Sequence, residues 1–531
     1  MLAAMPPPSS TPPNQGEPRI EDPLGAVVRE ARTPDRDATG EPGRPAPVVR
    51  DRGDACPGAL RLHTADDGRL ARLRLPGGML TNHQLDALAT AAERYGDGHL
   101  GITSRGNAEL RGLGDSCGTG LAELLRGAGL LPSERHERVR NIIASPLAGL
   151  DGLGHGDLRP WLRELDALLC GRDWTAALSG RFLFALDDGR GDVAGLGADV
   201  TLLAQPGGDT AVVRVGASAL RVAAADACRA ALAAAHAFLA TASAAGNGAW
   251  RVRELPPGCA VDLATALEHA GINASPATAN TPAVSTPADI PDPATANAPA
   301  GPATADLPTV PATADIPASP ATADVPAVST PADIPDPATA NAPAGSATAD
   351  LPTGPATADV PAASAAPGIV ASPDGTYALV VVPVLGRVGA RRLRALAGPA
   401  GEIRVTPWRG FVVPGFGERA ARERLRELGD AGFITAPGSP WTGVGACTGR
   451  PGCAKALADV RRDALPGPGA LPVYWSGCER RCGHPQGDWV DVTATADGHY
   501  TVAVRGTAAR EVPLAESELA EAVARARNGH T

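Results

Sequence analysis

The sequence predicts a mixed helix-and-strand fold built on an internal duplication, and three observations lead to this prediction. A strand–helix–strand pattern occurs twice along the 531 residues. A long segment of Ala, Thr, Pro and Asp separates the two copies. Four cysteines gather in two short loops near the C-terminus. With 44% hydrophobic residues, the chain has enough material for two or three packed domains.

The first copy of the pattern follows Asp67-Gly68. Residues 70–75 alternate between apolar and polar side chains, as in a strand with one buried face. Residues 82–95 have the periodicity of a helix. Residues 99–103 then form a second strand, which ends at Ser104-Arg105-Gly106-Asn107.

The second copy repeats this order after Asp374-Gly375. It consists of an apolar strand at residues 377–382, a helix at 388–397 and a strand at 402–406. That last strand ends at Pro407-Trp408-Arg409-Gly410, in the place of the Arg105 turn. The same elements in the same order predict a duplicated unit.

The segment between the copies, residues 274–367, is expected to be a disordered linker. Residues 282–309 recur as residues 326–353, with Pro302 replaced by Ser346 as the only difference. Frequent prolines prevent a helix or a central strand, and bulky apolar side chains are too few to offset the entropy of ordering. A solenoid is the alternative, but its repeats need a hydrophobic face. We also expect a disordered tail at residues 1–50.

Charge and hydropathy exclude several classes of protein. The formal net charge is −10, but nine aspartates lie in the linker, and the rest of the chain carries only −1. No basic footprint for nucleic acid is predicted. The longest apolar stretch, residues 217–245, is rich in Ala and interrupted by Arg and Asp, which is unfavourable for a membrane span. We found no signal peptide, so we expect a cytoplasmic protein that binds neither nucleic acid nor membrane.

Cys447, Cys453, Cys478 and Cys482 are candidate metal ligands. They form the pattern C-x5-C, a gap of 24 residues and C-x3-C. Gly449, Pro451 and Gly452 keep the first loop from being helical, so its amides can turn toward sulfur. We expect a helix at residues 454–465, with its positive end beside Cys453.

Three other interpretations of these cysteines remain open. Disulfides are disfavoured in a reducing compartment. Structural zinc also uses four thiolates, but its cysteine pairs usually have two to four intervening residues. The four could also be unrelated buried residues. The remaining five cysteines are scattered singly, and we expect each to be a small buried hydrophobe: Cys56, Cys117, Cys170, Cys228 and Cys259.

The cysteine spacing, with Thr448-Gly449 after the first cysteine and Gly477 before the third, resembles the four-iron four-sulfur site of the sulfite and nitrite reductases. The resemblance implies an α+β fold in which two ferredoxin-like half-domains join, each followed by an α+β domain. The implied divisions are a first half-domain at 51–130, an α+β domain at 131–273, a second half-domain at 368–434 and a cluster domain at 435–531.

The resemblance also implies arginines that grip the carboxylates of a tetrapyrrole, because a guanidinium binds carboxylates through paired hydrogen bonds. Arg105 matches the family's Thr-x-Arg strand end, Arg140 its Arg-Asn pair, and Arg181 the first basic position of its Lys-Phe-Lys strand. For Arg111 and Arg409, a solvated surface position has equal weight.

The second basic position of that strand is Leu183. A leucine removes a proton donor that the resemblance assigns to oxyanion reduction. Arg480 also stands between the last two cysteines, where a sulfite reductase has Asn. Residues 476–485, together with 55–58, 74–81 and 183–192, resemble the precorrin-3B synthases of aerobic cobalamin synthesis.

This resemblance implies an enzyme that uses molecular oxygen to hydroxylate a meso carbon of precorrin-3A and closes a lactone, forming precorrin-3B. It implies a 4Fe-4S cluster, a non-haem iron and an unidentified electron donor. His155 and His484 are candidate iron ligands, although a single histidine is more often structural. Two alternatives stay open: a sirohaem-dependent sulfite or nitrite reductase, and a non-catalytic tetrapyrrole-binding electron-transfer protein.

Overall fold

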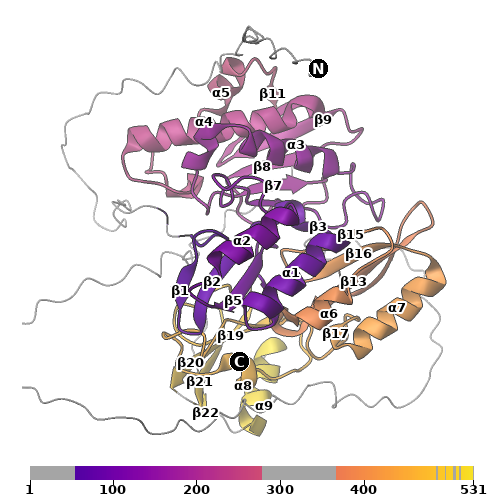
Figure 1. Cartoon of the computed structure of the whole chain (residues 1–531). Helices are drawn as coiled ribbons and strands as arrows, with labels where there is room; N and C mark the ends of the chain where they lie inside the picture. Colours follow the sequence, from indigo (N-terminus) through magenta and orange to yellow (C-terminus); the bar gives the residue numbers. More distant parts are fainter. Residues whose placement is uncertain are drawn as a thin grey trace, which may run out of the picture.

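The structure is a computed structural model, and it describes residues 54, 56–277, 366–485, 488–496, 498–505, 510–513 and 516–529. The predicted tail at 1–50 and residues 278–365 of the predicted linker lie outside this part of the chain. The described residues form four sheets. Figure 1 shows two of them in the middle of the molecule, one above and one below.

The first copy of the duplicated unit forms a five-stranded sheet in the order β1-β2-β5-β4-β14. Its strands are β1 (His63–Ala65), β2 (Gly68–Leu73), β5 (Ala108–Leu113), β4 (His99–Ile102) and β14 (Arg387–Gly389). Helices α1 (Asn82–Tyr95) and α2 (Gly118–Gly127) accompany it. The predicted helix at 82–95 is confirmed. It begins where Thr81 and Gln84 form a reciprocal capping box.

The second copy forms a sheet in the order β12-β13-β16-β15-β3. Its strands are β12 (Gly368–Ala371), β13 (Tyr377–Pro383), β16 (Phe411–Phe416), β15 (Glu402–Val405) and β3 (Met79–Thr81), and β17 (Phe433–Ile434) pairs with β13. Its helices are α6 (Ala390–Arg394) and α7 (Glu418–Asp430).

The two copies exchange a strand. β14 from the second copy pairs with β4, and β3 from the first copy pairs with β15. One apolar core therefore runs through both sheets, from Leu88 on α1 to Leu393 on α6. This exchange joins the two half-domains into one unit, as the resemblance implied.

A tight turn precedes each exchanged strand. Before β3, Gly77 and Gly78 both have positive φ, and a Cβ on Gly78 would lie 1.9 Å from the carbonyl oxygen of Val405. Before β14, Leu385 has a φ of 54° and Gly386 a φ of 67°. Only glycine fits the close approach at Gly78, because no side chain has room there.

The third sheet has the order β11-β10-β9-β8-β7-β6. Its strands are β6 (Ile142–Ala144), β7 (Phe184–Asp187), β8 (Val200–Ala204), β9 (Thr210–Val215), β10 (Ser218–Ala223) and β11 (Ser275–Pro276). α3 (Arg159–Cys170), α4 (Ala227–Ala245) and α5 (Leu263–His269) pack with it. Residues 224–245 are long and apolar enough to cross a membrane, but α4 packs in this domain's core through Cys228, Leu232 and Phe238.

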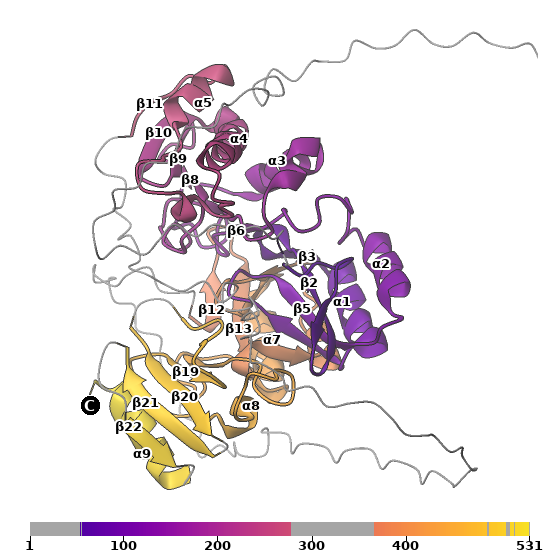
Figure 2. The same cartoon turned by 90° about the vertical axis from the view of Figure 1, so that its left-hand side faces the viewer.

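The fourth sheet has the order β18-β19-β20-β21-β22. Its strands are β18 (Val444–Ala446), β19 (Val473–Ser476), β20 (Val490–Ala496), β21 (His499–Val504) and β22 (Arg510–Pro513), with helices α8 (Val460–Asp463) and α9 (Glu516–Arg527). β18, β19 and β20 are parallel, and β21 and β22 continue antiparallel. Figure 2 shows this sheet with α9 beside it.

Three details of the predicted organisation were wrong. The helix expected at 454–465 is shorter, and only α8 forms, because Asp459 caps its start. The residues before Asp459 form a turn instead, in which the amide of Leu457 donates to the carbonyl oxygen of Gly477 at 2.7 Å. The linker was expected to start at 274, but β11 pairs with β10. Cys259 is exposed rather than buried, whereas Cys56 and Cys228 are buried as expected and Cys117 and Cys170 are half-buried.

Candidate functional site: two cysteine loops and an arginine-lined face

The two cysteine loops lie side by side at the ends of neighbouring parallel strands. Cys447 directly follows β18, and its amide donates to the carbonyl oxygen of Trp475 on β19 at 2.9 Å. Cys478 follows the end of β19 by two residues. The parallel pairing brings both loops to one edge of the sheet, although 30 residues separate Cys447 from Gly477.

The sulfur atoms have an environment suited to negative charge. The amide of Gly477 donates to Cys447 Sγ at 3.2 Å, and Arg461 lies close enough to favour the Cys447 thiolate. Burial nevertheless raises the pKa of Cys447. Burial, with the other three cysteines, raises the pKa of Cys482 to about 11. Because burial disfavours the thiolates of Cys447 and Cys482, a bound cation is needed to stabilise them.

The residues present fit a cluster better than a single zinc ion. Three aspartates in the described part of the chain have ligand atoms within 4.8 Å of one another. No three of the four cysteine sulfurs lie that close together. Around one zinc, four sulfurs at Zn–S distances of about 2.3 Å lie about 3.8 Å apart. A four-iron cluster is larger and spreads its four thiolates.

The first cysteine loop is attached to the first half-domain. Arg111 on β5 donates to both carboxylate oxygens of Asp67, at 2.8 and 2.9 Å, and to the carbonyl oxygen of Gly452 at 2.6 Å. The amide of Ala454 donates to the carboxylate of Asp66. Arg111 is therefore not a solvated surface arginine, because it positions the loop that carries Cys453.

The second cysteine loop is held by the second half-domain. Arg409, with a φ of 64°, donates to the carbonyl oxygen of Gly483 at 2.7 Å and lies over the ring of Tyr474. The hydroxyl of Tyr474 donates to the carbonyl oxygen of Cys482 at 2.6 Å. The Arg409 turn thus contacts the cluster domain.

Half-buried Arg461 adds a third attachment, which the sequence did not indicate. It donates to the carbonyl oxygens of Cys447, at 3.0 Å, and Leu385, at 3.4 Å. Burial, with Arg387 and Arg409 nearby, lowers its pKa to about 10. An arginine that bonds two carbonyls leaves no signal in the sequence, since neither partner is a side chain.

Two of the three predicted tetrapyrrole-binding arginines lie together. Arg105, in the turn after β4, donates to the backbone oxygen of Arg181 at 3.3 Å. Arg181 is 5% exposed, and its guanidinium lies 4.5 Å from the ring centre of Trp250. Buried Arg74 also reaches this region and donates to the carbonyl oxygen of Gly180 at 2.9 Å. The structure therefore brings Arg105 and Arg181 to one place.

Arg140 does not share that arrangement. Its Nε and Nη2 both bond to the carboxylate of Asp166 at 2.7 Å, and its Nη1 donates to the carbonyl oxygen of Leu130. All three nitrogens thus bond to protein groups, so Asp166 competes with any substrate carboxylate for Arg140, and its role in substrate binding stays a prediction. The sequence motif did not reveal Asp166, because that partner lies 26 residues away on α3.

Leu183 is buried in an apolar patch. It is 2% exposed and packs with Ile143, Ala185 and Val193, with Trp408 of the second half-domain against this group. Phe182 and Phe184, on either side of Leu183, pack instead into the core of the domain. The environment of Leu183 suits a hydrocarbon, and a charged side chain there would be costly.

The candidate iron ligands His155 and His484 contact different residues. The ring of His484 stacks on Trp489, with ring centres 5.1 Å apart. His155 is exposed and lies over Gly189, since a Cβ there would be 2.2 Å from its Cδ2. Neither contact pairs one histidine with the other, and the structure assigns no iron ligand.

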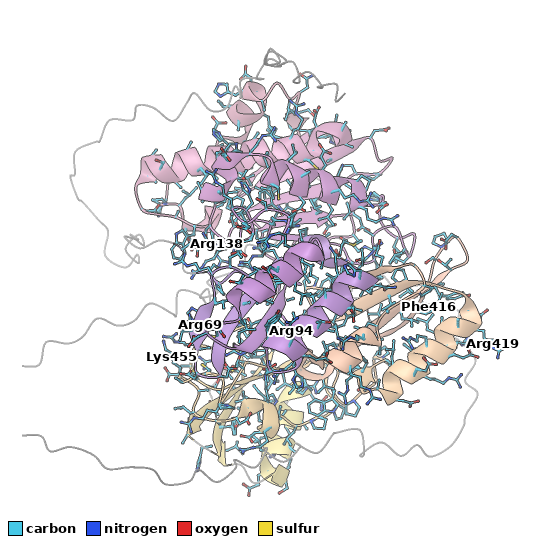
Figure 3. The ribbon with its side chains drawn as sticks, in the orientation of Figure 1. Arg69, Arg94, Arg138, Phe416, Arg419 and Lys455 are labelled. Carbon is cyan, nitrogen blue, oxygen red and sulfur yellow. The ribbon has the colours of Figure 1, made fainter. Side chains whose placement is uncertain are left out.

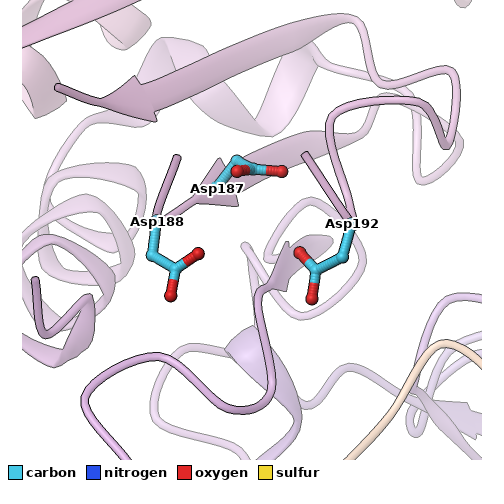
Figure 4. Close-up of side chains that lie close together, drawn as sticks. All are labelled: Asp187, Asp188 and Asp192. Atoms are coloured by element: carbon cyan, nitrogen blue, oxygen red, sulfur yellow. The ribbon is translucent and has the colours of Figure 1, made fainter. Parts of the chain in front are cut away.

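A group of aspartates lies near His155. The carboxylates of Asp187, Asp188 and Asp192 converge in Figure 4, and one oxygen of each lies within 4.8 Å of the others. However, Arg190 pairs with Asp188 at 2.7 Å, and Asp187 accepts four backbone amides. Burial, with Asp187 and Asp188 adding to it, raises the pKa of Asp192 to about 6. These partners already compensate the group, so we assign it no metal.

Of two basic residues labelled in Figure 3, Lys455 is exposed, whereas Arg138 is half-buried and paired with a carboxylate. Lys455, which follows the first cysteine loop, projects from the outer side of the molecule in Figure 3. Arg138, labelled in the same view, lies beside Asp54, with Nη1 to Oδ2 at 3.5 Å.

Comparisons with known proteins agree with this fold. The family described as the nitrite/sulfite reductase ferredoxin-like half domain matches residues 63–117. A solved structure of the Mycobacterium tuberculosis NirA protein aligns with a TM-score of 0.52 at 16% identity, covering 84% of this chain and 78% of that one. The fold class predicted above, two ferredoxin-like half-domains with α+β domains, is confirmed.

Sequence relatives cover shorter segments. A precorrin-3B synthase from Sinorhizobium sp. is 35% identical over 167 residues, which are 31% of this chain and 35% of that protein. A ferredoxin–nitrite reductase from Synechococcus elongatus is 38% identical over 127 residues, which are 23% of this chain and 25% of that protein. The matched segments thus span about a third or less of these relatives. The chain is thus similar over these segments to a precorrin-3B synthase and to a nitrite reductase, and similar in fold to NirA.

Proposed function

We propose that this protein is an oxidoreductase of aerobic cobalamin biosynthesis that converts precorrin-3A to precorrin-3B with molecular oxygen. The observation that carries the proposal is Leu183. A reductase of this superfamily needs a proton donor at that position, whereas here a leucine is 2% exposed among Ile143, Val193 and Trp408. The similarity to a precorrin-3B synthase supports the same conclusion.

In this proposal, Cys447, Cys453, Cys478 and Cys482 hold a 4Fe-4S cluster. The Gly477 amide, the Arg111 attachment and the Arg461 side chain favour a fixed arrangement of these cysteines. The cluster supplies single electrons when bound. A non-haem iron near the substrate is also proposed, with protein ligands left unassigned, and so is an unidentified electron donor.

Arg105 and Arg181 are proposed to bind carboxylate arms of the substrate. Arg181 is held on the ring of Trp250, so less side-chain entropy is lost when a carboxylate pairs with it. The buried apolar surface at Leu183 and Trp408 excludes water near the macrocycle. In the reaction, one oxygen atom enters the product and the other leaves as water, using two electrons from the donor.

The nitrite reductase similarity favours a second candidate, a sirohaem-dependent sulfite or nitrite reductase. Sirohaem would then bind at the arginine-lined face instead of precorrin-3A. The two candidates differ in what the purified protein contains and in what it consumes.

The test uses the full chain, purified without oxygen. We expect iron and sulfide without stoichiometric sirohaem. Given a reductant and labelled oxygen gas, the protein should convert precorrin-3A to a product heavier by one labelled oxygen atom. Steady nitrite or sulfite reduction by a sirohaem-containing preparation, with precorrin-3A unchanged, would replace this proposal with the second candidate.

A further inference from the structure

Ser476 has a buried hydroxyl without a partner among the described residues. The residue is 0% exposed, and its Oγ makes no hydrogen bond. Buried hydroxyls in folded proteins nearly always bond to something. An orphan donor of this kind points to an acceptor that is absent from the polypeptide.

The direction of this hydroxyl follows from strand β19. Side chains alternate along a strand, and Val473 and Trp475 lie in the apolar core of the cluster domain. Tyr474 and Ser476 therefore face the other side of the sheet. The second cysteine loop lies on that side, because the Tyr474 hydroxyl donates to the backbone oxygen of Cys482.

Ser476 lies close in sequence to groups that contact or supply the proposed cluster ligands. The next residue, Gly477, donates its amide to Cys447 Sγ at 3.2 Å, and Cys478 follows it. The packing here is close, since a Cβ on Gly477 would lie 2.7 Å from the Cβ of Ala456. The buried Ser476 hydroxyl is thus one residue away from the amide that contacts a proposed ligand sulfur.

We propose that the Ser476 hydroxyl donates a hydrogen bond to a sulfur atom of the cluster and raises the reduction potential of that cluster. This inference rests on the proposed 4Fe-4S cluster. The reduced cluster carries more negative charge on its sulfurs, so a donor stabilises it more than the oxidised cluster. Ser476 is a positioning residue for electron transfer and not a cluster ligand.

The test is a redox titration of the full chain, with cluster reduction followed by absorption and electron paramagnetic resonance. Ser476→Ala should lower the ratio of reduced to oxidised cluster at a fixed potential about three- to tenfold, with iron and sulfide content unchanged. A tenfold change corresponds to about 59 mV for one electron. Ser476→Thr, which keeps the hydroxyl, should restore the ratio. The control is Ser372→Ala, which removes another buried hydroxyl without a partner, in the turn between β12 and β13, and it should change nothing.

A wild-type midpoint in Ser476→Ala would overturn the inference and leave the cluster assignment intact. Absence of iron and sulfide from the wild-type protein would overturn the assignment and the inference together. If Ser476→Ala loses its iron, the titration is repeated with Ser476→Cys. A thiol is a weaker hydrogen-bond donor than a hydroxyl, so this variant should also lower the reduction potential of the cluster. A wild-type midpoint in that variant would equally overturn the inference.

Discussion

The side-chain amide of Asn107 donates a 3.0 Å hydrogen bond to Oδ1 of Asn141, and the amide of Asn141 in turn donates to the carbonyl oxygen of Phe182. Both asparagines are buried. The oxygen of Asn107 accepts the amide of Leu75 at 3.0 Å. This chain of bonds joins the turn that carries Arg105 to the strand end that carries Arg181, and so fixes the two arginines relative to each other.

The first prediction concerns the arginine-lined face. Arg105→Ala and Arg181→Ala should each weaken precorrin-3A binding by about 2–5 kcal/mol, because a substrate carboxylate loses its partner in a partly dry site. Iron content should stay at the wild-type level. Fluorescence titration under argon measures the affinity, and Arg419→Ala on the exposed face of α7 is the control. Unchanged affinity in both variants would place these residues outside the site.

The second prediction concerns Arg140, which we assign a structural role. Arg140→Ala should reduce the free energy of unfolding by about 3 kcal/mol, because it leaves Asp166 without its partner. Denaturant unfolding measures this loss. Arg135→Ala breaks a solvent-exposed pair with Asp173 and should cost less than about 1 kcal/mol. Equal losses in the two variants would contradict the assignment.

The third prediction concerns the proposed cluster ligands. Replacing Cys447, Cys453, Cys478 or Cys482 by Ser should remove most iron and sulfide, because each thiolate holds one corner of the cluster. Iron and sulfide analysis after anaerobic purification measures this. Cys117→Ser and Cys259→Ser are matched controls and should retain both elements. Zinc in place of iron would favour the structural-zinc alternative.

The fourth prediction concerns the attachment of the first cysteine loop. Arg111→Ala removes the bonds to Asp67 and Gly452, so the loop should open more often and lose iron to a chelator several times faster. Arg69→Ala is the control, since Arg69 makes an exposed pair with Asp115 nearby. Identical rates of iron loss in both variants would show that Arg111 does not hold the loop.

The fifth prediction concerns pH and Asp192. Its folded pKa of about 6 lies above the ordinary value of 3.8, so the folded state binds more protons than the unfolded state between these values. The contribution of Asp192 to stability is therefore fully present below pH 4 and lost as pH rises through 6. Asp192→Asn should be more stable than wild type at pH 7, by up to about 3 kcal/mol. This difference should vanish near pH 4 in denaturant unfolding, and a difference independent of pH would refute the argument.

The sequence by itself determined the repeated unit, the fold class and the four clustered cysteines. These features depend on local periodicity and on spacing within short segments, which the chain carries directly. The helix α1 is an example, because its apolar residues recur with the helical period. Its capping residues Thr81 and Gln84 stand only three positions apart. The resemblance to the sulfite and nitrite reductases likewise rested on motifs of a few residues.

Only the tertiary structure decided which charged groups are free and which are already paired. Arg140 matched a ligand motif but bonds to Asp166, and Arg111 looked like a surface residue but holds Gly452, 341 residues away. The exchange of β3 and β14, the shortness of α8 and the orphan hydroxyl of Ser476 were also decided by long-range packing. The physical reason is that hydrogen bonds and burial depend on distance in space, and a sequence pattern specifies that distance only within one element.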